Sequence, residues 1–158
     1  MKKYAFLLTA LAAVACNWFS EAENSGANPR AEAAVPSDTT GAFSVARALE
    51  HLGEKKQWVK GYVVGGNLSS SATGIRFEPP FTVDTHLAIA DTATVALKAS
   101  CLSVQLPSGA VRDSFNLVDH PELLGVRVYM QGDLVNAYYG IPGLKNVTQI
   151  LLASPVQR

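Results

Sequence analysis

The residues best suited to acid–base chemistry or metal binding near neutral pH are three histidines, His51, His86 and His120. Asp91 stands five residues after His86, and Asp119 directly precedes His120. Either pair could supply an acid and a base, although a strand end or a turn explains each aspartate more simply. The histidines have no metal-ligand spacing with one another or with Cys101. No Gly-rich phosphate loop, nucleophile elbow or HExxH motif occurs. We therefore expect a protein that is not an enzyme and has neither cofactor nor metal.

Aromatic rings and cations offer a second chemistry, because rings that stack on bases contribute ~1–3 kcal/mol per base. The candidate ligand-binding residues are Tyr62, Arg76, Phe77, Phe81, Tyr138 and Tyr139. Further cations that could line a basic groove with Arg76 are Lys60, Lys98, Arg127 and Lys145. The competing role for each ring is packing at an end of the fold, and for each cation a solvated surface.

The apolar pattern predicts the elements that position these residues. A helix is expected over residues 43–53, with Ser44 as its N-terminal cap and Gly53 after its end. One or two short helices are expected within residues 108–125. Alternating apolar and polar positions predict five strands, at residues 58–65, 86–91, 101–106, 127–134 and 144–152.

Three strands, a helix and two strands is the order of an OB-fold, a small five-stranded barrel. Gly61 and Gly132 stand within expected strands, where sharp curvature favours residues without a side chain. A five-stranded sandwich fragment is the competing architecture, but the helix between the third and fourth strands argues against it. OB barrels bind along strands two and three, beside the loops that here are residues 66–85 and the segment NAYYGIPG.

Composition limits the size and class of the protein. The 158 residues suit one ordinary domain, and 48% are hydrophobic. Thirteen Lys and Arg balance 13 Asp and Glu, which argues against a protein that coats nucleic acid. Two cysteines exclude a disulfide-rich scaffold, and we expect Cys101 to pack as a small buried residue.

The N-terminus reads as a targeting signal. Lys2 and Lys3 precede the apolar run YAFLLTALAAVA, which is shorter than the ~20 residues that span a bilayer. The residues AVAC that end at Cys16 resemble a bacterial lipoprotein box, although Ala13 stands where that box usually has Leu. The resemblance implies a signal peptide at residues 1–15 and lipidation of Cys16. Ordinary cleavage or an uncleaved anchor is the alternative.

A polar segment separates Cys16 from the expected domain. Residues 17–42 carry four acidic residues against Arg30 and are poor in apolar residues, so residues 16–42 are expected to form a flexible acidic tether. The stretch SEAE at residues 20–23 loosely resembles a surface-export signal of Bacteroidetes-type lipoproteins. The alternative is a solvated tether that no export machinery recognises.

The domain itself, residues 43–158, resembles a family of small Bacteroidetes lipoproteins that carry an uncharacterised OB-fold domain. The resemblance covers about residues 43–152, and its most specific stretches are VQLPSGAVRDSFNLVDHPELLG and GIPGLKNVT. Weaker stretches are GYVVGG, HLAIADT and VYMQGDLVNAYYG. The resemblance implies the fold and an envelope location, and it implies no activity, ligand or catalytic residue.

The sequence thus predicts a lipid-anchored bacterial envelope protein, at the outer membrane, whose OB-like domain is a binding module. A partner protein or an envelope component such as a glycan is the expected ligand. Binding of single-stranded nucleic acid or oligosaccharide on the barrel face is the alternative, with nucleic acid not favoured because the charge is balanced.

Overall fold

The computed structural model describes residues 41–153. The expected signal peptide, Cys16 and nearly all of the tether lie outside the described residues, as do residues 154–158. No helix among the described residues is both long enough and apolar enough to cross a membrane.

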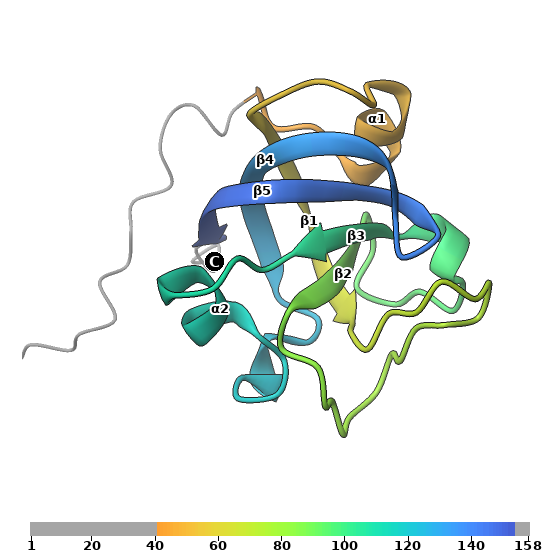
Figure 1. Cartoon of the computed structure of the whole chain (residues 1–158), viewed down its shortest axis with the longest axis vertical. Helices are drawn as coiled ribbons and strands as arrows, with labels where there is room; N and C mark the ends of the chain where they lie inside the picture. Colours follow the sequence, from red (N-terminus) through yellow and green to blue (C-terminus); the bar gives the residue numbers. More distant parts are fainter. Residues whose placement is uncertain (1–40, 154–158) are drawn as a thin grey trace, which may run out of the picture. The chain divides into compact units, whose positions relative to one another are not determined.

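Five strands form a closed barrel in the order β1-β2-β3-β5-β4 (Figure 1). Their bounds are β1 Gln57–Gly65, β2 His86–Ala90, β3 Leu102–Gln105, β4 Arg127–Tyr138 and β5 Ile141–Leu152. All neighbouring strands are antiparallel except β3 and β5, which pair in parallel at Ser103↔Gly143 and Val104↔Leu144. The expected OB-like barrel is confirmed.

Alternating side chains fill the barrel, as the strand patterns predict. Val59 and Val63 of β1, and Val128, Met130 and Leu134 of β4, are at most 1% exposed. Burying a side chain of this size stabilises a fold by about 1.5–3 kcal/mol. These residues belong to the main core. Side chains from the two short α-helices, at residues 45–50 and 110–115, and from neighbouring segments also pack in this core.

Gly132 lies where the pairing of β4 with β5 shifts register, and it allows the two backbones to approach closely. A Cβ at this position would lie 2.7 Å from the carbonyl oxygen of Lys145. Gly61 is similarly enclosed, with the Ala90 carbonyl oxygen 3.0 Å from the position of a Cβ. The interpretation of both glycines as barrel-curvature positions agrees with this crowding.

The helices are α1 Val45–Glu50, α2 Ala110–Phe115, and the 3-10 turns η2 Lys98–Ser100 and η3 Pro121–Leu123. Ser44 caps α1, as expected, by accepting a hydrogen bond from the Arg47 amide at 3.1 Å. Asp91 also holds this end, accepting from the amides of Val45 at 2.7 Å and Ala46 at 2.9 Å.

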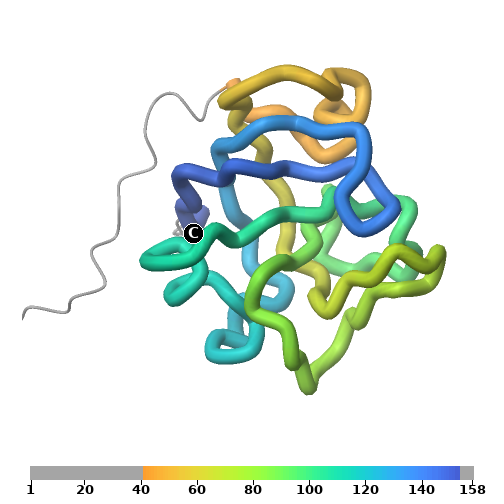
Figure 2. The backbone as a smooth tube through the Cα atoms, in the orientation of Figure 1, coloured from red at the N-terminus to blue at the C-terminus, as the bar shows by residue number. Residues whose placement is uncertain are grey.

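The connection between β4 and β5 is shorter than the expected loop NAYYGIPG. Both strands continue into that segment, so only Tyr139 and Gly140 lie between them. Their φ angles are 55° and 82°, which suit a tight hairpin turn. Pro142 lies within β5, although proline usually argues against a strand. In Figure 2 the hairpin reaches the same side of the barrel as the loops at residues 66–85 and 91–101.

Candidate functional site

The outer face of β2 and β3, the expected ligand-binding face, is covered by the chain itself. All five residues of β2 are buried, including Ala88 and Ala90, which point away from the barrel core. Their cover is a second cluster of apolar side chains, here called the outer cluster. Its buried members are Val64, Leu68, Ala88, Ala90, Cys101 and Ile141, and its partly buried members are Tyr62, Ile75, Phe77, Val95 and Tyr139.

The loops and the hairpin supply much of this cover. Leu68, Ile75 and Phe77 come from the loop that follows β1, and Val95 from the loop that follows β2. Tyr139 comes from the hairpin turn. A ligand therefore meets these segments before it meets β2.

The predicted ligand-binding residues are spread over three environments. Phe81 is 7% exposed and belongs to the main core. Phe77 and Tyr139 pack in the outer cluster, while Arg76 is exposed and its backbone pairs with Gly66. Tyr138 contacts Tyr139, with ring centroids 4.6 Å apart and ring planes inclined at 59°.

Tyr62 packs against the edge of the outer cluster and also belongs to the outer surface that β1 and β4 share. The register sets Tyr62 opposite Arg127 and Lys60 opposite Tyr129. Val59, Gly61 and Val63 face the core, so the residues between them point outward. We call Trp58, Lys60, Tyr62, Arg127 and Tyr129 the β1–β4 face.

Each of the two facing pairs joins an aromatic residue to a cation. The Arg127 guanidinium lies 5.8 Å from the centre of the Tyr62 ring. Arg127 is exposed, and the other four residues of the face are half-buried. Neither Lys60 nor Arg127 forms an ion pair with a carboxylate among residues 41–153. Both charges are thus available to an anionic ligand.

A pocket of about 250 Å³ opens at one side of this face. Its lining residues are Ser44, Lys60, Gly61, Tyr62, Asp91 and Arg127. Both carboxylate oxygens of Asp91 already accept amide hydrogen bonds from α1. The pocket therefore combines an aromatic ring, two cations that have no ion pair within the described residues, and one carboxylate that already bonds the backbone of α1.

Trp58 and Tyr129 of the β1–β4 face were not among the candidates from sequence. Both residues occupy outward-facing positions of paired strands, and this pattern could have identified them. That signal requires the register of β1 against β4, which joins residues about 70 positions apart.

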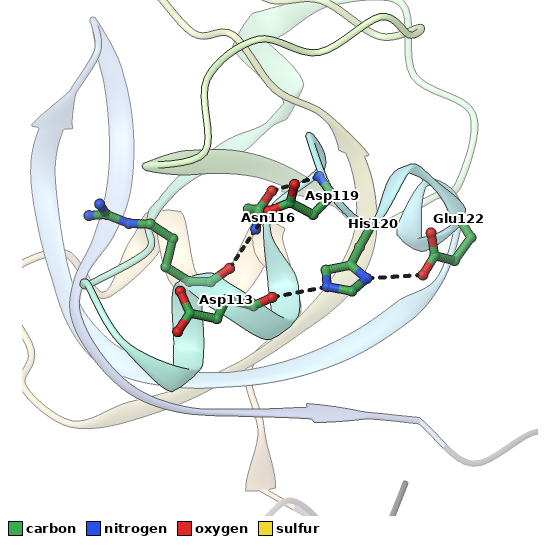
Figure 3. A network of polar contacts seen from close by, with 6 residues as sticks. Asp113, Asn116, Asp119, His120 and Glu122 are labelled. Atoms are coloured by element: carbon green, nitrogen blue, oxygen red, sulfur yellow. Dashed lines mark hydrogen bonds and ion pairs between the residues drawn. The ribbon is translucent and has the colours of Figure 1, made fainter. Parts of the chain in front are cut away.

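The polar candidates for acid–base chemistry are not brought together. The His86 ring bonds Leu68 and Thr85, and the Asp91 side chain bonds α1. Asp119 bonds Asn116, while His120 contacts the Asp113 carbonyl and Glu122 (Figure 3). No group of three or more His, Cys, Asp and Glu side chains that could hold a metal ion exists within the described part of the chain.

Comparison with known proteins gives a family and one distant relative. The sequence pattern of a family described as "Domain of unknown function (DUF6359)" matches residues 43–153. "Endonuclease YhcR" of Bacillus subtilis (strain 168) is 36% identical over 105 residues, which are 66% of this chain and 8% of that protein. The chain thus spans less than a tenth of this relative's length. No solved structure matches the chain significantly.

Proposed function

The chain belongs to the DUF6359 family, and 105 of its residues are 36% identical to part of a protein named an endonuclease. We propose that its barrel binds single-stranded nucleic acid on the β1–β4 face. The observation that carries this proposal is the facing of Tyr62 with Arg127 and of Lys60 with Tyr129. The rings offer stacking surfaces to bases, and the cations lie where phosphates would follow them.

The sequence alone favours a protein or glycan ligand over nucleic acid, whereas we propose nucleic acid as the first choice. The charge of the described domain is balanced, but a balanced total says nothing of where charges gather. Lys60 and Arg127 line one pocket and have no carboxylate partner among residues 41–153, whereas Lys55 is paired with Asp133 at 3.4 Å. Cations beside aromatic rings suit a ligand that carries both anionic groups and flat rings, and single-stranded nucleic acid supplies both.

The module is also proposed to bind without cleaving and to be held at a bacterial membrane by lipidated Cys16. The support for binding alone is that the two candidate acid–base pairs are separated and engaged in structural hydrogen bonds. The support for the anchor is the AVAC sequence at residues 13–16, and the acidic segment after it would act as a spacer.

The test is a titration of fluorescently labelled single-stranded DNA with the full chain, followed by anisotropy at low and physiological salt. We expect binding that weakens with salt. Lys60→Ala and Arg127→Ala should each reduce the salt slope by about 0.7, the contribution of one phosphate contact on a single strand.

Arg76→Ala is the matched control, because Arg76 is also exposed but lies on the covering loop. It should leave the affinity and the salt slope unchanged. No binding at low salt, or an equal loss in the Arg76 variant, would show that the β1–β4 face is not a nucleic-acid site. Salt-insensitive binding of a neutral oligosaccharide alone would assign the face to sugars instead.

A further inference from the structure

A buried histidine holds the covering loop to β2. His86 is 2% exposed, and its Nε2 accepts a hydrogen bond from the backbone amide of Leu68 at 2.9 Å. Its Nδ1 lies 3.0 Å from the Thr85 hydroxyl. Leu68 belongs to the loop and is buried in the outer cluster, so this one ring joins the loop to the strand that the loop covers.

The contact requires the neutral form of His86. An amide N–H can only donate, so Nε2 must keep its lone pair and the proton must reside on Nδ1. Protonation would place a second N–H against the Leu68 amide, deep in an apolar cluster. The hydrogen bond is then replaced by a repulsive contact between two donors, and a charge is buried.

A second buried contact fastens the same loop. The Lys98 ammonium donates to the carbonyls of Ser69, Ser71 and Tyr139, the last two at 2.8 and 2.6 Å. Lys98 is 4% exposed, and these three acceptors match its three donors. The His86 ring lies 4.3 Å from the Tyr139 ring, so both contacts converge on the hairpin turn.

We propose that His86 is an acid-released latch, which holds the loop at residues 66–75 closed over β2 at neutral pH and frees it when the ring is protonated. Opening would uncover the outer side of β2, at Ala88 and Ala90, where OB barrels commonly bind ligands. The inference does not rest on the proposed nucleic-acid site, although the two adjoin, because Tyr62 of the β1–β4 face pairs with Ala90 and packs against the outer cluster.

The surroundings of His86 favour release by acid. Burial lowers the pKa of His86, and the negative charge of Asp84 opposes this in part. The Lys98 ammonium is the charged group on the other side of the hairpin turn, where it donates to the Tyr139 carbonyl. The rings of Tyr138 and Tyr139 also face His86, and burial raises the pKa of Tyr138.

The direction in which pH shifts the opening equilibrium follows from the linkage between proton binding and opening. In the open loop His86 titrates near its ordinary value of 6.5, whereas in the closed loop it binds a proton only at lower pH. Below pH 6.5 proton uptake therefore favours the open loop. Each unit by which closure lowers the pKa allows a tenfold shift in the opening equilibrium.

The test is amide hydrogen exchange of the full chain, measured by NMR between pH 7.5 and 5 and corrected for intrinsic rates. We expect the protection of the Leu68 amide to fall as pH falls. The amide of Val63 within β1, which donates to the Val126 carbonyl at 2.9 Å, should keep its protection and exclude global unfolding. Constant protection at Leu68 would overturn the latch.

His86→Gln is the matched variant, since a glutamine oxygen can accept from Leu68 but does not titrate. Its Leu68 protection should be independent of pH, and persistence of the wild-type dependence would overturn the proposal. A titration of the His86 ring by NMR in the wild-type chain does not depend on that variant folding. The ring and the amides of residues 69–74 should shift with one midpoint, and separate midpoints would contradict the latch.

Discussion

At the scale of single residues, Lys98 is the cation whose role sequence reasoning misjudged most. It was considered for a basic groove, yet its ammonium is enclosed by three backbone carbonyls from the loop after β1 and the hairpin turn. A charge so placed stabilises the fold only because every donor has an acceptor.

We expect Lys98→Met to lower the free energy of unfolding by about 3 kcal/mol, because it leaves buried carbonyls without a donor. Urea denaturation followed by tryptophan fluorescence measures the loss. Lys55→Met is the control, since Lys55 is exposed and should change stability by less than about 1 kcal/mol. Equal stability of the two variants would contradict the structural role of the ammonium.

Cys101 shows a residue whose role the sequence predicted correctly. It is fully buried in the outer cluster, and burial raises the pKa of its thiol to about 11. A thiol held neutral and covered is a poor nucleophile. The expectation that it packs as a small residue is confirmed.

At the scale of elements, the predicted strands and helices occur in the structure because each carries a local pattern. The first helix is shorter than predicted, since α1 ends at Glu50 and not beside Gly53. Alternation identified β1 and β4, and the cap at Ser44 identified the start of α1. The predicted ends are least accurate at the β4–β5 hairpin. Asn136 before Tyr138 and Pro142 after Gly140 hid the continuation of both strands, which only their pairing establishes.

A substitution at Gly132 tests whether the close approach of β4 and β5 depends on the absence of a side chain. We expect Gly132→Ala to lower the free energy of unfolding by about 1–3 kcal/mol, because the new methyl group meets the backbone of Lys145 and the side chain of Leu144. Thermal unfolding measures the effect. Gly41→Ala, where a Cβ meets nothing within 4 Å, should be nearly neutral. A melting temperature equal to that of the Gly41 variant would refute the need for a close approach of β5 to Gly132.

At the scale of the whole molecule, the structure separates two faces of one barrel. Loops and a hairpin turn cover the outer side of β2, while the β1–β4 face remains accessible. Placing ligand contacts on strands two and three follows the usual behaviour of OB barrels, but here that surface is occupied by the chain. The proposed ligand face therefore moves to the neighbouring strands.

The proposed anchor predicts how the full chain distributes in a bacterial cell. Cys16→Ala should abolish incorporation of a labelled fatty acid and shift the protein out of the membrane fraction, because the acylated thiol is lost. Cys101→Ala is the control and should keep both the label and the membrane fraction. Label retained by the Cys16 variant would contradict the anchor.

The sequence by itself determined the barrel class, the strand positions and the inward residues, because periodic apolar positions and turn residues are local signals. It also indicated that the histidines and aspartates form no obvious reacting group. Tertiary structure alone decided which rings are covered and which cations are unpaired. Those properties depend on contacts such as Lys60 opposite Tyr129 and Leu68 on His86, which join residues far apart in the chain. Closure of the barrel creates these contacts, so no local pattern contains them.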